Sequence, residues 1–171
     1  MNRCSIRSVT PAEAFPLRRY LLRPMLPARA SHYEGDNLPG AFHLGAFAEL
    51  GDEEELVGVV SFLPQNPAGE FDRRVYQLQG MVTLPAVRNQ GVGARLAGYG
   101  LARLTAQGAT LVWCNARTAA SSFYERLGFR AEGEEFMTPG TGPHYRFVLD
   151  LEAGRSDEQA FAWAAQSYEL E

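Results

Sequence analysis

The sequence predicts an α/β (α+β) domain with a central mixed, mostly antiparallel sheet of about six to seven strands and helices on its faces. Three observations support this fold class. A β-prone stretch at 74–83 passes through a glycine-containing turn into a helical pattern. Apolar stretches at 42–50 and 56–63 flank a short acidic turn, which is typical of an antiparallel hairpin. An apolar run at 110–114 follows the helix, so a right-handed crossover should pair it in parallel with the 74–83 strand.

The remaining elements follow from the same kind of pattern. Residues 3–9 predict a first strand, and Thr10 begins a capping-box sequence for a helix. Because Pro16 comes too early for a regular helix, we expect a kink or a single turn before a helix at 17–22. Residues 23–40 contain three prolines and predict a long loop with a short helix, a type of segment that is often functional. The other expected elements are a loop at 64–72, a helix from 92 that Gly108 closes, a helix at 117–127 and strands at 129–136 and 144–151.

Composition indicates an ordinary globular chain. It has 171 residues, of which 46% are hydrophobic and 21% charged, and its formal net charge of −4 gives no general attraction to nucleic acid or to an anionic membrane. Cys4 and Cys114 lack metal-ligand spacing, so we expect reduced thiols and no metal site. Neither a signal-peptide pattern nor an apolar run long enough to cross a bilayer is present, so we expect a cytoplasmic protein.

We expect one domain over residues 1–151, followed by a helical tail at 152–171. Phe161, Ala165 and Tyr168 would share one face of that tail helix. Such a face can pack on its own domain or on a second copy of the chain, and we favour a homodimer contact.

The segment 84–93 lies between a strand and a helix and has the features of an anion-binding turn. Leu84 and Pro85 end the strand, because proline cannot donate to a ladder. The first N–H groups of the following helix lack intrahelical partners and carry partial positive charge, so they suit a phosphate. Glycine at 91 and 93 allows close approach of a diphosphate to the backbone, and Arg88 can add a charge-assisted contact.

Two common phosphate-binding loops do not fit this segment. A Walker loop requires a lysine, and the chain contains none. A dinucleotide fingerprint requires a third glycine where Leu96 stands, and an acidic residue at the end of the next strand, which instead finishes with Asn115. A nicotinamide-dependent reductase is therefore disfavoured.

The remaining pattern, Arg-x-x-Gly-x-Gly between a strand and a helix, resembles the pyrophosphate loop of the GNAT superfamily of N-acetyltransferases. Residues 120–129, which read ASSFYERLGF, are similar to that superfamily's A-x-x-x-Y-E-x-x-G-F segment. The resemblance covers roughly residues 3–151. It implies acetyl-CoA as cosubstrate and a GNAT fold, with a V-shaped opening between the two parallel central strands.

The resemblance also implies the residues that contact acetyl-CoA. The backbone of Val82 and Thr83 would face the cosubstrate, beside a bulge that Gly80 suits. Many relatives have an asparagine seven residues before the tyrosine of the second motif. Here Arg117 holds that place and Asn115 lies two residues earlier, and either could make the contact. The complete expected set is Val82, Thr83, Arg88, Asn89, Gln90, Gly91, Val92, Gly93, Ala94, Asn115, Arg117 and Ser122.

For catalysis, the resemblance implies that Tyr124 is the general acid, which gives a proton to the departing sulfur. The alternative is a core tyrosine with its hydroxyl bonded elsewhere. The sequence does not identify the general base, and Glu134 is one candidate for it. We expect His43 to be structural and Cys114 to be a buried thiol, because direct transfer in a ternary complex needs no acyl-enzyme. The base candidates are His32, Glu34, Asp36, Glu134, Glu135 and His144.

The sequence thus predicts an N-acetyltransferase that acts on a primary amine of a small molecule. The acidic residues at 34–36 and 134–135 favour a cationic acceptor such as a polyamine or an amino sugar, while an amino acid or a protein N-terminus stays open. The alternative function is a non-catalytic acyl-CoA-binding sensor. The presence of Tyr124 together with an intact phosphate turn favours the enzyme.

Overall fold

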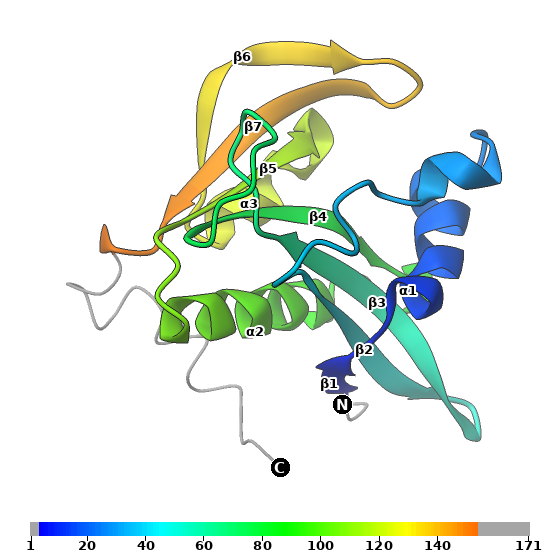
Figure 1. Cartoon of the computed structure of the whole chain (residues 1–171). Helices are drawn as coiled ribbons and strands as arrows, with labels where there is room; N and C mark the ends of the chain where they lie inside the picture. The colour runs from blue at the N-terminus through cyan, green and yellow to red at the C-terminus, as the bar shows by residue number, and fades with distance from the viewer. Residues whose placement is uncertain (1–3, 154–171) are drawn as a thin grey trace. The chain divides into compact units, whose positions relative to one another are not determined.

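The computed structural model describes residues 4–153, and Figure 1 shows the arrangement of the elements along the chain. The strands are β1 (Cys4–Ser8), β2 (Phe42–Leu50), β3 (Glu53–Leu63), β4 (Val75–Thr83), β5 (Leu111–Arg117), β6 (Arg130–Thr138) and β7 (Gly142–Asp150). The α-helices are α1 (Pro11–Leu17), α2 (Val92–Ala106) and α3 (Ser121–Arg126). Shorter helical turns are η1 (Arg18–Leu22), η2 (Ala28–Ser31), η3 (Pro85–Val87) and η4 (Thr118–Ala120).

The strands form one seven-stranded mixed sheet in the order β1-β2-β3-β4-β5-β7-β6. The pairs β1–β2, β2–β3, β5–β7 and β6–β7 are antiparallel, whereas β4 and β5 are parallel. The parallel register runs from Val75↔Leu111 to Gln77↔Trp113, although both strands continue beyond this last pair. The expected fold class, including the parallel pairing across the crossover helix, is confirmed.

Within residues 4–153 the contacts divide the chain into two compact units. Unit 1 comprises residues 4–63 and 79–100, and unit 2 comprises 64–78 and 101–153. Strand β4 and helix α2 each contribute to both units. Each unit is described by itself below.

In unit 1, helices pack on both faces of β3. Val59 lies in a buried cluster with Ala14 of α1. Phe62 is three residues further along β3, so its side chain points to the other face from that of Val59. There it contacts α2 closely, because a Cβ added at Gly100 would come within 2.1 Å of the Phe62 ring. Because successive strand residues point to opposite faces, α1 and α2 lie on opposite sides of this strand.

In unit 2, α3 packs on the β5–β7 ladder through an aromatic cluster. The Tyr124 ring stacks on Phe147 with their centroids 5.6 Å apart and meets Phe129 edge-on at the same centroid distance. Gly128 follows α3 with φ 95°, a backbone conformation that glycine adopts readily. Burial of these aromatic rings fixes the position of the short helix.

Several expected element boundaries were wrong. The turn between β2 and β3 is shorter than expected, since the acidic residues from Glu53 onward belong to β3. Helical turns run through Pro16 into η1, which is π-helical. Strand β5 extends to Arg117, because the register with β7 continues to His144, so the next helix begins later, with η4 and α3. The expected tail helix and its dimer contact lie outside the described residues.

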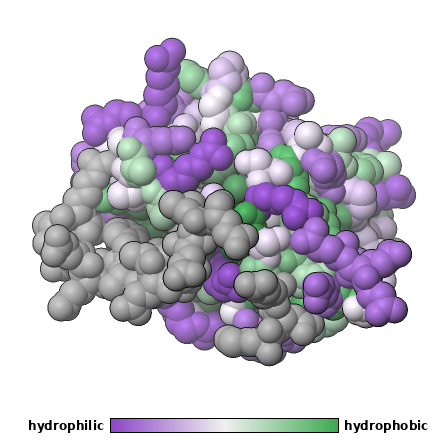
Figure 2. All heavy atoms as spheres, turned by 90° about the horizontal axis from the view of Figure 1, so that it is seen from below, coloured by the Kyte–Doolittle hydropathy of each residue, from purple (hydrophilic) through white to green (hydrophobic). Residues whose placement is uncertain are grey.

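None of the helices described for residues 4–153 is long and apolar enough to cross a membrane. Figure 2 shows one face of the molecule, on which hydrophilic residues surround smaller hydrophobic areas. Such a mixed surface is ordinary for a folded chain, because apolar atoms contribute much of any protein surface.

Candidate functional site

The turn between β4 and α2, in unit 1, is held by hydrogen bonds that leave its outer edge exposed. The Leu84 N–H donates to the Val57 carbonyl at 2.7 Å, which ties the end of β4 to β3. The Gln90 side chain donates from Nε2 to the Ala86 carbonyl at 2.9 Å. Arg88 donates from Nε to the Thr83 carbonyl at 3.3 Å, and its side chain is exposed. The guanidinium is therefore placed beside the turn.

The backbone of this turn takes the left-handed conformation at two positions. Asn89 has φ 61° and Gly91 has φ 79°. A Cβ added at Gly91 would meet no atom within 4 Å, so the backbone there borders open space. Helix α2 begins at the next residue and is 15 residues long, and its first N–H groups point out of the helix end. These features fit a diphosphate, as the sequence predicts.

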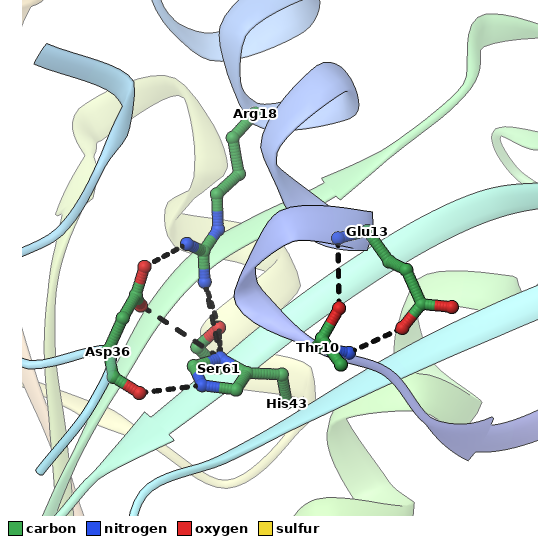
Figure 3. Close-up of polar contacts among 6 residues, drawn as sticks. All are labelled: Thr10, Glu13, Arg18, Asp36, His43 and Ser61. Carbon is green, nitrogen blue, oxygen red and sulfur yellow. Dashed lines mark hydrogen bonds and ion pairs between the residues drawn. The ribbon is translucent and has the colours of Figure 1, made fainter. Parts of the chain in front are cut away.

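The interior of unit 1 also contains a charged network, shown in Figure 3. Arg18 of η1 donates from Nη1 to Oδ2 of Asp36 at 2.7 Å and from Nη2 to the Ser61 hydroxyl. Arg18 is 1% exposed and Asp36 6% exposed. Because a buried charge must be paired, the two residues fasten the 23–40 loop to η1 and to β3.

His43 completes the network from β2. Its Nε2 lies 3.0 Å from the Asp36 carbonyl oxygen and its Nδ1 lies 2.6 Å from the Ser61 hydroxyl. A carbonyl can only accept, so Nε2 carries the hydrogen and Nδ1 accepts from Ser61 in the neutral ring. Burial lowers the pKa of His43, against the opposing effects of the hydrogen bond to Asp36 and of its charge. His43 is therefore buried with both ring nitrogens hydrogen-bonded, which fits the expectation of a structural histidine.

The same network contacts β4 at Gly80. This glycine has φ 64°, and a Cβ there would lie 2.8 Å from Nε of Arg18 and 3.1 Å from the Tyr33 ring. Left-handed backbone within a strand is the geometry of a bulge. The left-handed φ is compatible with the expected bulge, and the close contacts with Arg18 and Tyr33 show that the interior is crowded at this glycine.

In unit 2, Tyr124 combines a buried ring with a hydroxyl that is unbonded within the described residues. The residue is 6% exposed, and its hydroxyl makes no hydrogen bond to any residue of the described range. Burial raises the pKa of this hydroxyl well above its ordinary value, and the neighbouring Cys114 thiol raises it further. Burial also raises the pKa of the Cys114 thiol, which is 1% exposed. Both groups hold their protons at neutral pH.

The other expected site residues of unit 2 do not all lie on the face of the β5–β7 ladder that Tyr124 covers. Cys114 pairs with Phe147 in the β5–β7 register, and both face Tyr124. Asn115 and Arg117 have the opposite parity to Cys114, so they lie on the other face of the ladder, where both are exposed. Ser122 is exposed on α3, and Glu134 is exposed on β6.

Two more features bear on an acceptor site. An open hollow of about 460 Å³ lies beside α1 and η1 in unit 1, and its lining is Phe15, Pro16, Arg19, Tyr20 and Pro24. Among the base candidates, Glu135 accepts a hydrogen bond from the Thr118 hydroxyl at 2.8 Å. Asp36 is held in an ion pair with Arg18, with Oδ2 2.7 Å from Nη1.

The comparison with protein families decides the identity. The model of the acetyltransferase (GNAT) family matches residues 14–129. The chain belongs to this family. The N-acetyltransferase YitI of Bacillus subtilis (strain 168), itself uncharacterised, is 31% identical over 150 residues, which cover 88% of this chain and 98% of YitI.

Solved structures agree with the GNAT fold. Escherichia coli ElaA superimposes with a TM-score of 0.67 at 18% identity, over 85% of this chain and 99% of ElaA. An aminoglycoside 6'-N-acetyltransferase complexed with coenzyme A gives a TM-score of 0.64 at 16% identity, over 86% of this chain and 97% of that one. At such identities the likeness shows the fold alone. Family membership makes this protein an acyltransferase, in a family that uses acetyl-CoA.

Sequence reasoning missed several residues of this GNAT domain that the structure brings together. Arg18 stands in an ordinary amphipathic stretch, and its partner Asp36 lies 18 residues away along the chain. Arg146 and Trp113 approach each other only through the pairing of β5 with β7. No local pattern signals either association. For Arg146 the sequence shows only that a charged residue stands in a strand that is otherwise largely apolar.

Proposed function

We propose that this GNAT protein transfers an acetyl group from acetyl-CoA directly to a primary amine of a small molecule, in a ternary complex. The observation that carries the proposal is the left-handed glycine turn at Gly91, which opens the start of α2 to an anionic ligand. This turn accounts for donor binding, and family membership accounts for the reaction class.

Residues of the turn would hold the diphosphate of acetyl-CoA. The N–H groups of residues 89–94 supply donors, and the exposed Arg88 guanidinium adds a charge-assisted contact. The backbone of Val82 and Thr83 would bind the pantetheine portion, because the parallel pairing of β4 ends before these residues. Asn115, Arg117 and Ser122 remain candidates for further contacts to the cosubstrate.

Acetyl-CoA supplies an acetyl group activated as a thioester. A bond forms from the acceptor nitrogen to the acyl carbon, and the carbon–sulfur bond breaks. Tyr124 would give its hydroxyl proton to the departing sulfur, since this hydroxyl is protonated and makes no hydrogen bond within residues 4–153. The proton lost by the ammonium acceptor would pass to Glu134 or to water, and Tyr124 regains its proton from solvent.

The test is CoA release from acetyl-CoA with pooled amines sorted by chemical class, and with an amine-free control. Release above the control with any amine pool supports the proposal and names the acceptor class. If every pool stays at the control rate while acetyl-CoA still raises the melting temperature, donor binding survives and amine acetylation fails. If acetyl-CoA does not raise the melting temperature, the assignment of the turn is wrong.

A further inference from the structure

A cationic platform in unit 2 contains two residues, Arg146 and Trp113, that have no role in the mechanism so far. It consists of Arg146 on β7 with Trp113 and Asn115 on β5. The Arg146 Cζ lies 5.2 Å from the centroid of the Trp113 ring, and its Nε donates to Oδ1 of Asn115 at 3.5 Å, the outer limit of a hydrogen bond. Trp113 is itself fixed, because its indole N–H donates to the Gln65 carbonyl at 2.9 Å and the residue is 4% exposed. The platform therefore presents a guanidinium that lies over the Trp113 ring and is contacted at its Nε edge by Asn115.

Within residues 4–153 no hydrogen bond or ion pair is made by the two terminal nitrogens of Arg146. Arg146 forms no ion pair with any carboxylate in the described part of the chain, although Glu132 stands opposite it in the β6–β7 register. The register shifts next to Glu132, and Gly133 has φ 77°, so β6 changes direction at this point. Three arginines of the described range do form ion pairs, namely Arg7 with Glu54, Arg18 with Asp36 and Arg74 with Glu152.

The platform lies where the parallel pairing of β4 and β5 ends. Gln77 and Trp113 are the last pair of that ladder, and Asn115 follows Trp113 on the same face. Cross-strand pairing with Asn115 puts Arg146 on this face as well. Tyr124, the proposed acid, packs on the opposite face of the same β5–β7 ladder through Phe147, so the platform and the acid belong to one unit.

We infer that the platform binds a carboxylate of the acceptor, which makes the acceptor an amine that also carries a carboxylate, of the amino acid type. A guanidinium presents two parallel N–H donors that match the two oxygens of a carboxylate, and stacking on an aromatic ring preorganises it. Two of the carboxylates that could instead recognise a cationic acceptor are engaged elsewhere, since Asp36 pairs with Arg18 and Glu135 accepts from Thr118. This inference rests on the proposed function.

The first test compares matched acceptors with the Arg146→Gln variant. Each amino acid is assayed beside its carboxamide and beside the amine that lacks the carboxyl group, with polyamines and amino sugars as further pools. Loss of a hydrogen-bonded charge pair should raise the acceptor KM about 10- to 100-fold and abolish the preference for the carboxylate over the carboxamide, while the KM for acetyl-CoA stays unchanged. Arg146→Lys keeps the charge without the fork and should give an intermediate KM.

Two further variants sharpen this test. Arg126→Gln removes an exposed arginine of α3 in the same unit and should leave the acceptor preference intact. Glu132→Gln removes the carboxylate opposite Arg146 and should lower the acceptor KM a few-fold, because a like charge near the ligand is lost. Turnover of polyamines or amino sugars that Arg146→Gln does not affect would overturn the inference and leave the proposed function standing.

A binding measurement covers the case in which no amine is acetylated. The chain has two tryptophans, so Trp163→Phe leaves Trp113 as the single reporter. N-acetyl amino acids, with their amides as uncharged controls, are titrated against Trp113 fluorescence in the full-length protein. Saturable quenching that is lost in Arg146→Gln but kept in Arg126→Gln supports the carboxylate site even if the proposed reaction fails. Equal responses to the acids and the amides, or no saturable response, overturn the inference.

Discussion

Tyr124 has its ring buried in an aromatic cluster and its hydroxyl without a hydrogen-bond partner in the described residues. In Tyr124→Phe we expect kcat to fall by about 10²- to 10⁴-fold, the usual contribution of a positioned proton donor. The melting temperature should change little, because the ring packing is kept and no hydrogen bond within residues 4–153 is lost. Both quantities can be measured by CoA release and by thermal unfolding.

The raised pKa of Tyr124 adds a pH dependence to this prediction. Burial keeps the Tyr124 hydroxyl protonated even at a pH above its ordinary pKa of about 10. We therefore expect that kcat does not fall through deprotonation of Tyr124 at any pH up to about 10. A tyrosine that acts only in packing gives a different result, namely the same kcat in Tyr124→Phe as in the natural chain. That outcome would remove Tyr124 as the acid.

Gly91 offers a second test on a single residue. In Gly91→Ala the left-handed backbone should cost about 1–2 kcal/mol of stability, and the new methyl group should raise the KM for acetyl-CoA because it enters the space open to the diphosphate. Gly51→Ala is the matched control, since Gly51 has φ 74° and equally open surroundings in the β2–β3 turn. The control should lose similar stability with an unchanged KM. Equal KM values in both variants would contradict the assignment of the turn.

Individual residues of the site were predictable where the chemistry is local. The glycine turn and Arg88 could be read from the sequence, since strand, turn and helix follow one another directly along the chain. The environment of Asp36 could not, because the ion pair with Arg18 depends on how the 23–40 loop folds back. The same holds for Arg146, whose contact with Trp113 requires the β5–β7 register.

At the scale of the elements, the 23–40 loop is held to β2 by a hydrogen bond between His43 and the Asp36 carbonyl, and His43 can be protonated. His43 accepts from Ser61 only as a neutral ring, and its pKa is lowered in the folded state, so its contribution to stability is complete above the unfolded pKa of about 6.5. That contribution is lost as the pH falls from 6.5 toward the lower folded pKa, because the unfolded chain binds the proton more readily. We therefore expect the free energy of unfolding to decrease across this window.

The measurement is urea unfolding at a series of pH values for the natural chain and for His43→Gln. The variant should be less stable at neutral pH and should lose the slope just below pH 6.5. Hydrogen bonds with Thr10 lower the pKa of Glu13. The contribution of Glu13 to stability is therefore lost only below its ordinary pKa of about 4.3, and this loss at lower pH should be the same in both proteins. An identical slope near pH 6 in both proteins would show that other groups cause it.

The predicted elements differ in how closely they match the structure, and the reason is physical. The capping box at Thr10 and the glycine that ends α2 at 108 depend on neighbouring residues, and both are present. The extent of β5 was underestimated, because Asn115 and Arg117 join the strand only through their pairing with β7. Strand length is set by the partner strand, which local sequence does not contain.

For the whole molecule, the two units share elements. Since β4 and α2 each belong to both, unfolding of one unit removes residues that the other unit needs. We expect a single urea transition, with coincident curves from far-UV circular dichroism and from Trp113 fluorescence in the Trp163→Phe background. Addition of acetyl-CoA at 100 times its dissociation constant should stabilise the protein by about 2.7 kcal/mol. Two separated transitions would contradict this expectation.

The division of the chain also has a consequence for biosynthesis. Unit 1 is made from residues 4–63 and 79–100, so during translation its first segment leaves the ribosome well before the second is available. Until Gly100 has emerged, the ring of Phe62 lacks the helix surface that covers it in the finished protein. The nascent β2–β3 hairpin therefore exposes apolar residues for several seconds at ordinary elongation rates of about 5–20 residues per second. The cell must protect this segment from association with other chains until the later half of the unit arrives.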